Sequence, residues 1–225
     1  DGGGLQPARL RGMSQEPVFN PAFRARLREL LVWRRDVRRF RREALPADAI
    51  GRLIETAALA PSVGLSQPWR FVLVETVERR AAVRADFARC NAAALAVQAP
   101  ERQRLYAGLK LAGLDDAPCQ IAVFTDDATG QGRGLGRLSM PETSAYSAVM
   151  AVHTLWLAAR AEGLGMGWVS ILDPEAVAAI LEVPRDWRLI GYFCLGYPAE
   201  ADDAPALERA GWEHRRPAES FVIRR

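Results

Sequence analysis

The chain has 225 residues, 49% of them hydrophobic and 25% charged, which is enough to bury the core of a single globular domain. A formal net charge of only +3 argues against a nucleic-acid-binding protein, and three widely spaced cysteines fit neither a disulfide framework nor a zinc motif. No apolar run has the roughly 18 residues that a membrane span needs, so we expect no membrane association and a location in the reducing cytoplasm.

Five segments are predicted to be helical from the spacing of their apolar residues. The first follows a leader, 1–18, which we expect to be disordered or added for expression, and it has Asn20 as N-cap and Pro21 at its first position. The third is divided at Pro100. The fourth is apolar nearly all round and is therefore expected to be the most buried. The predicted helices cover 20–35, 45–61, 77–113, 143–163 and 173–183.

Short runs rich in β-branched and aromatic residues lie between these helices and are predicted to be strands. The glycine-rich stretch 128–141 is expected to be a flexible loop. The polar tail after Pro198 ends in the apolar stretch 220–225, which is predicted to be a short strand that packs either on a partner subunit or on its own chain. The predicted strands cover 69–76, 119–127, 164–172 and 188–197.

Six arginines lie between Arg34 and Arg42, in the stretch "RRDVRRFRR", with Asp36 as the single acid among them. Arginine suits phosphate because its planar fork makes paired, charge-assisted hydrogen bonds. Arg34, Arg35 and Arg38 are close enough along the chain to converge on one phosphate. Composition alone leaves a solvated face as an equal alternative for the whole cluster, and the remaining three arginines are assigned to such a face.

Two further segments offer a hydroxyl group and room for a ligand. In "APSVGLSQPW", Ser62 precedes a glycine that permits close approach. In "GLGMGWVSI", the glycines would permit close approach of a planar ligand, and Ser170 ends that approach. Taken singly, the first segment is equally well a turn before a strand, and the second a buried strand.

Metal ligands are scarce in the sequence. Only two histidines are present, so a multi-histidine metal site is not expected. His153 lies in the apolar helix and is interpreted as a core histidine, and His214 in the polar tail is interpreted as solvated.

In combination, four segments resemble the FMN-dependent nitroreductase superfamily. "RRDVRRF" is similar to its phosphate-binding motif, and "APSVGLSQPWRFVLV" to its flavin segment. "AARAEGLGMGWVSI" is similar to its central helix and following strand, and "GWEHRRPAESFV" to its late arginine-before-proline segment. The stretches "RRDVR", "LWLAARAEG" and "CLG" narrow the resemblance to the 5,6-dimethylbenzimidazole synthases of this superfamily.

This resemblance implies an α+β, nitroreductase-like three-layer fold with a central mixed, mostly antiparallel sheet flanked by helices. Residues 19–225 would form a single FMN-binding domain with a lid at about 92–113 and a C-terminal arm that packs on the partner subunit of a homodimer, with FMN at the interface. Such enzymes fragment reduced FMN with molecular oxygen into 5,6-dimethylbenzimidazole, the lower ligand of cobalamin, and erythrose 4-phosphate. They use no metal, and an external flavin reductase supplies the reduced FMN.

The same resemblance implies roles for individual residues. Asp36 is expected to take a proton from the ribityl chain, kept ionised and oriented by adjacent arginines, with a plain ion pair as the alternative. Ser170 is expected to hydrogen-bond near flavin N5 or to relay a proton, unless it only caps the strand end. Lys110 is expected to stabilise anionic reduced flavin near its N1–C2 carbonyl edge, unless it is solvated. The expected FMN-binding residues are Arg34, Arg35, Asp36, Val37, Arg38, Ser62, Lys110, Ser170 and Arg215.

Some alternatives stay open at this point. Arg215 is preferred to Arg216 because it stands two residues before Pro217, although the two are hard to separate. An FMN-dependent NAD(P)H nitroreductase or flavin reductase would retain and cycle its FMN, and a third alternative is a non-catalytic flavin-binding or nucleic-acid-binding module. Asp36 and the predicted lid favour the destructive reaction, since closure would protect a reactive intermediate.

Overall fold

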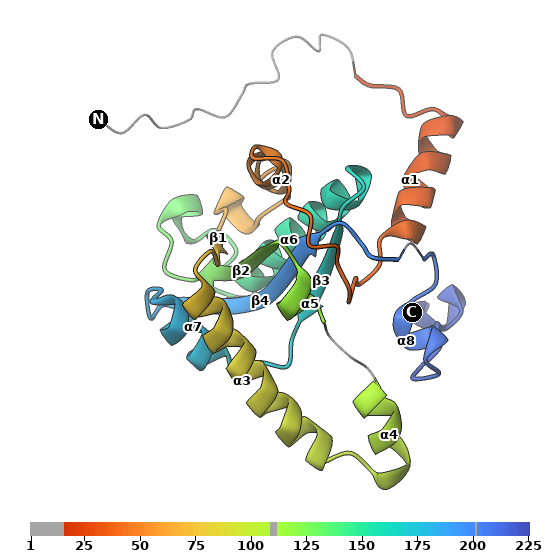
Figure 1. Cartoon of the computed structure of the whole chain (residues 1–225). Coiled ribbons are helices and arrows are strands. Elements are labelled where there is room, and N and C mark those ends of the chain that lie inside the picture. The colour runs from red at the N-terminus through yellow and green to blue at the C-terminus, as the bar shows by residue number, and fades with distance from the viewer. Residues whose placement is uncertain (1–15, 109–111, 201) are drawn as a thin grey trace.

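The computed structural model describes residues 16–108, 112–200 and 202–225. At its centre lies a four-stranded sheet with the strand order β1-β2-β4-β3, in which all neighbouring strands are antiparallel (Figure 1). One isolated parallel bridge, between Asp36 and Met166, joins a loop to the edge of this sheet. The strands are β1 Trp69–Leu73, β2 Cys119–Asp126, β3 Gly165–Val169 and β4 Trp187–Gly196.

The helices begin and end close to where the sequence predicts. The side chain of Asn20 accepts a hydrogen bond from the N–H of Phe23 at 2.9 Å, and Pro21 opens the first helix, so the predicted cap is confirmed. The predicted break is also confirmed, because α3 ends at Ala96 and α4 begins at Pro100. The helices are α1 Pro21–Trp33, α2 Ala49–Ala57, α3 Val77–Ala96, α4 Pro100–Gly108, α5 Gly113–Asp116, α6 Thr143–Ala161, α7 Pro174–Leu181 and α8 Ala206–Arg209, with short 3₁₀ turns η1 Val63–Leu65, η2 Gln131–Gly134 and η3 Ala218–Phe221.

Helices cover both faces of the sheet. Alternate residues of each strand point to opposite faces, and apolar residues on both faces are buried beneath helices. Ala122 and Phe124 of β2 belong to a core made with α3, α5 and α7. Ile121 and Val123 of the same strand belong to a second core made with α2 and α6. All four side chains are fully buried. The predicted three-layer α+β fold is therefore confirmed.

The central helix α6 contains more buried residues than any other helix in the described ranges, as predicted. Only one of its sides contacts the sheet, however, and its other side is exposed. α1 stands apart from the sheet and packs on α6 (Figure 1). Both helices carry exposed apolar side chains, which we call together the α1–α6 apolar face: Phe23, Leu27, Leu31, Tyr146, Val149 and Met150.

Two expectations about individual segments are wrong. His153 is exposed rather than part of the core, because it lies on the side of α6 that faces away from the sheet. The tail 220–225 forms no strand within the described chain: it begins in η3, and Val222 and Ile223 remain exposed. The apolar residues alone suggested a strand, but no described strand pairs with them.

Residues 1–15 of the predicted leader lie outside the described residues.

The predicted lid is described in part, and Lys110 within it lies outside the described residues. α4 stands at the far end of α3, away from the sheet (Figure 1). It contacts the C-terminal segment, because the guanidinium carbon of Arg102 lies 5.5 Å from the ring centroid of Trp212 and the ring of Tyr106 lies 6.3 Å from that ring.

Two kinds of feature are absent from the described ranges. No helix there combines the length and the apolar character that crossing a membrane requires. No group of three or more histidine, cysteine or acidic side chains there is arranged to hold a metal ion.

Candidate functional site

The arginine loop, residues 34–40, leaves the end of α1 and lies across β3. The N–H of Val37 donates to the carbonyl oxygen of Met166 at 3.1 Å, which anchors the middle of the loop to the strand. A Cβ at Gly165 would come within 2.6 Å of Cγ2 of Val37, and one at Gly167 would lie well under 3.0 Å from the carbonyl oxygen of Val37. The room that we assigned to a planar ligand is therefore taken by the arginine loop.

Asp36 is half-buried in this loop and makes one hydrogen bond and one ion pair. Its Oδ1 accepts a hydrogen bond from the N–H of Trp168 at 2.8 Å, and its Oδ2 lies 3.7 Å from Nε of Arg38. Burial raises the pKa of Asp36, and the hydrogen bond and the neighbouring arginines offset only part of that rise. That the arginines keep this carboxylate ionised stays a prediction. They help to orient it, but desolvation outweighs them and makes it a stronger base than an exposed aspartate.

Arg34, Arg35 and Arg215 form a group of mutually repelling positive charges. Burial lowers the pKa of Arg34 and of Arg35, and repulsion from Arg215 lowers both further. The guanidinium carbon of Arg34 lies 4.9 Å from the ring centroid of Trp156, a cation–π contact that holds it in place. Cations that are held together against their repulsion favour an anion between them. Of the two neighbouring arginines in the tail, Arg215 rather than Arg216 is the one that repels Arg34 and Arg35.

Arg35 is turned toward the C-terminal segment. Its Nε donates to the carbonyl oxygen of Asp203 at 2.8 Å, and its Nη2 donates to the same oxygen. The indole N–H of Trp156 donates to the carbonyl oxygen of Arg35 at 3.2 Å. The guanidinium that we expected to bind phosphate directly thus fastens two chain segments together in this structure.

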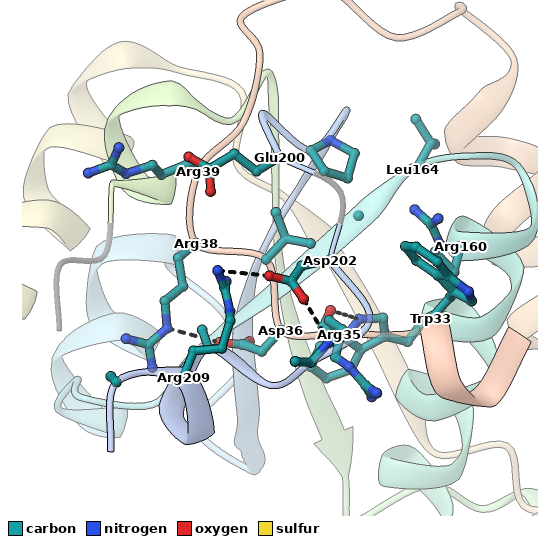
Figure 2. A pocket seen from close by; sticks show the side chains of 17 residues that line it. Trp33, Arg35, Asp36, Arg38, Arg39, Arg160, Leu164, Glu200, Asp202 and Arg209 are labelled. Atoms are coloured by element: carbon teal, nitrogen blue, oxygen red, sulfur yellow. Dashed lines mark hydrogen bonds and ion pairs between the residues drawn. The ribbon is translucent and has the colours of Figure 1, made fainter. Parts of the chain in front are cut away.

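A cavity of about 270 Å³ opens between the arginine loop and the C-terminal segment (Figure 2). Arg209 pairs with Asp202 at 2.8 Å on one side of it, and Arg38 lies beside Asp36 on another. Nε of Arg38 is buried and makes no hydrogen bond within the described chain. Because a buried donor without a partner is costly, this atom is suited to an acceptor on a ligand.

Ser62 lies at the other end of α6 from the arginine loop. Its Oγ accepts a hydrogen bond from the N–H of Gln67 at 3.1 Å, and the N–H of Val63 donates to Oγ of Ser147 at 3.0 Å. Trp156, which contacts the arginine loop, is nine residues beyond Ser147 in α6, a distance of about 13 Å along the helix axis. One chain alone therefore does not bring Ser62 to the arginines.

Ser170 follows the last residue of β3, and its side chain is exposed. It stands two residues after Trp168, whose N–H holds Asp36, so both candidate catalytic residues lie at the same end of β3. Lys110 falls outside the described residues.

Three residues that hold the site were not predicted. Trp156 and Trp168 occur in apolar runs, where an aromatic residue indicates core packing and not contact with a loop 121 and 132 residues earlier in the chain. Asp203 acts through its backbone carbonyl group, which no sequence pattern reveals.

Known proteins are similar to this chain in sequence. The family model described as the nitroreductase family matches residues 31–197. A 5,6-dimethylbenzimidazole synthase of Rhodospirillum rubrum is 57% identical over 205 residues, covering 91% of this chain and 97% of that protein. One from Rhodobacter capsulatus is 49% identical over 201 residues, covering 89% and 97%.

The fold has solved counterparts. The crystal structure of an oxidized iodotyrosine deiodinase bound to FMN and 3-iodo-L-tyrosine superposes with a TM-score of 0.68 at 24% identity, covering 88% of this chain and 97% of that one. The resemblance drawn from the sequence motifs is confirmed by the relatives above. The chain belongs to the nitroreductase family, and 5,6-dimethylbenzimidazole synthases are among its relatives.

Proposed function

We propose that this chain is a 5,6-dimethylbenzimidazole synthase, which converts reduced FMN and molecular oxygen into 5,6-dimethylbenzimidazole and erythrose 4-phosphate. Two relatives of that name, 57% and 49% identical to it, support the proposal. The structural observation that carries it is the half-buried Asp36 carboxylate inside an arginine loop. A flavoenzyme that only cycles FMN has no use for a base beside the ribityl chain.

The residues present suit the phosphate of FMN. Arg34 and Arg215 supply positive charge, and the buried Nε of Arg38 supplies a donor that lacks an acceptor. Arg35 is assigned a supporting role, because its guanidinium already holds the C-terminal segment at Asp203. The backbone of the loop, including Val37, is assigned to the ribityl chain. When bound, reduced FMN supplies both the carbon skeleton of the product and the electrons that oxygen accepts.

Asp36 is assigned the role of general base at the ribityl chain. Its Oδ1 is held by the N–H of Trp168, so Oδ2 is the oxygen left to accept a proton. A carboxylate is a more effective base when its pKa lies closer to the working pH, and burial shifts the pKa of Asp36 in that direction. Ser170, at the same end of β3, is assigned a hydrogen bond near flavin N5 or a proton relay.

A homodimer completes the proposal. Burial of the α1–α6 apolar face against a second copy would be favourable. We assign FMN to that interface, with Ser62 contributed across it, the C-terminal arm packed on the partner, and Lys110 and the lid over the flavin. An external flavin reductase in the cytoplasm would supply the reduced FMN.

The test is product analysis. Reduced FMN is mixed with the protein in air, and 5,6-dimethylbenzimidazole is measured by chromatography and erythrose 4-phosphate by a coupled enzymatic assay. Wild type should form both in equal amounts, and Asp36→Asn should bind FMN but form neither. Quantitative recovery of FMN after repeated oxidation would contradict the proposal and favour an ordinary nitroreductase or flavin reductase.

A further inference from the structure

Asp86 is a buried acid far from the arginine loop in sequence. It lies in the middle of α3 and is 6% exposed, and no other acidic residue in the described part of the chain is buried. Burying a carboxylate is costly unless donors surround it. Its contacts therefore indicate what it holds in place.

The two oxygens of Asp86 face two different elements. Oδ2 accepts a hydrogen bond from the backbone N–H of Asp173 at 2.8 Å, across the gap between α3 and α7. Oδ1 accepts one from Nη2 of Arg89 at 2.5 Å, and the same nitrogen lies 3.3 Å from Oδ2 of Asp173. Arg89 thus bridges the two acids and offsets their repulsion. Sγ of Cys90 lies 3.9 Å from either oxygen of Asp86 and adds only a weak contact.

Asp173 ends the link that carries Ser170. The four-residue link 170–173 joins β3 to α7. At its start, Val169 is fixed by pairing with Tyr192 of β4. At its end, Oδ1 of Asp173 caps α7 by accepting hydrogen bonds from the N–H groups at 175 and 176. The Asp86 carboxylate accepts a hydrogen bond from the backbone N–H of Asp173 at that end, so the link is fixed at both of its ends.

We propose that Asp86 is a positioning residue, which fixes the 170–173 link and so places the Ser170 hydroxyl for the reaction. This inference rests on the proposed function of Ser170. A free link would let Ser170 sample several positions, and a misplacement of about 1 Å can lower the rate a hundredfold. The role of Asp86 is separate from that of Asp36, because it touches neither the arginine loop nor the cavity in the described contacts.

The first measurement is hydrogen exchange on the full chain without flavin. Asp86→Asn replaces a charged acceptor with a neutral one, and we expect amide exchange in 170–173 to become about tenfold faster, as loss of a charge-assisted bond to a buried N–H implies. Glu78→Gln, the same chemical change on the exposed first turn of α3, is the control and should leave that exchange unchanged. Unaltered exchange in Asp86→Asn would overturn the inference.

The second measurement is a double-mutant cycle on the rate of dimethylbenzimidazole formation. Asp86→Asn should lower the rate about tenfold in wild type but less than twofold in Ser170→Ala, because its effect passes through that hydroxyl. An equal loss of rate from Asp86→Asn in both backgrounds would show a merely structural role for Asp86. A normal rate in Ser170→Ala would show that the Ser170 hydroxyl is not needed for the reaction. Either result overturns the inference. A wild type that forms no dimethylbenzimidazole would contradict the proposed function instead, and exchange would still decide whether Asp86 holds the link.

Discussion

The substitution Gly167→Ala tests how closely the arginine loop is fitted to β3. The added Cβ would lie well under 3.0 Å from the carbonyl oxygen of Val37, and this oxygen belongs to backbone, which cannot rotate away. Relief of the clash requires the loop to move by about 1 Å, because packed interiors leave little slack. Such a shift would break two hydrogen bonds. One runs from the N–H of Val37 to the carbonyl oxygen of Met166 at 3.1 Å, and the other from the N–H of Trp168 to Oδ1 of Asp36 at 2.8 Å.

The expected loss can be estimated from these two bonds. A neutral backbone bond contributes about 1 kcal/mol and a bond to a carboxylate about 1.5–3 kcal/mol, so their loss totals about 3 kcal/mol. For a protein of this size, about 3 kcal/mol lowers the Tm by roughly 6–12 °C. The binding of FMN should weaken at least tenfold, since the loop carries the phosphate-binding arginines.

The assay combines thermal unfolding with flavin titration. Gly51→Ala is the matched control, because a methyl group on this helical glycine would meet nothing within 4 Å beyond its chain neighbours and the backbone of its own helix. The substitution should raise stability by about 0.5–1 kcal/mol. A Gly167→Ala protein with the Tm and the FMN affinity of wild type would refute the placement of the arginine loop on β3.

Three further predictions concern charge and assembly. The raised pKa of Asp36 means that the folded state binds the proton of this carboxyl group more tightly than the unfolded state does. The stability that the protonated carboxyl group contributes is therefore present at low pH and lost as pH rises. In scanning fluorimetry, Asp36→Asn should unfold at a higher temperature than wild type at pH 7.5, and the difference should close toward pH 4. Calorimetric titration should show that Arg215→Ala weakens FMN binding at least tenfold and Arg216→Ala less than threefold, and equal losses would contradict the choice between them. Light scattering should show Leu27→Glu as a monomer and wild type as a dimer, whereas an unchanged dimer would place the interface elsewhere.

The elements and the arginine loop could be predicted from sequence because their causes are local. A cap at Asn20, a break at Pro100 and the alternation within β2 act over a few residues. The concentration of arginines around Asp36 is also visible in the sequence as it stands. Such features depend on propensity and spacing, which a single chain displays directly.

The remaining features depend on contacts between distant segments. The glycines of β3 suggested room for a ligand, yet Val37, about 130 residues earlier, fills it. Whether burial or neighbouring arginines would control the pKa of Asp36 depended on how deeply the loop packs. His153 was misplaced because an all-round apolar helix does not reveal which side faces the sheet. No local pattern contains this information.

The fate of the flavin separates destruction of FMN from its reuse. Reduced FMN, prepared without oxygen, is mixed with the protein and air, and FMN, dimethylbenzimidazole and erythrose 4-phosphate are quantified together over time. We predict one dimethylbenzimidazole for each FMN lost in wild type and none in Asp36→Asn, with FMN still bound. Full recovery of FMN by wild type, or normal product formation by Asp36→Asn, would contradict the proposed destruction of FMN with Asp36 as its base.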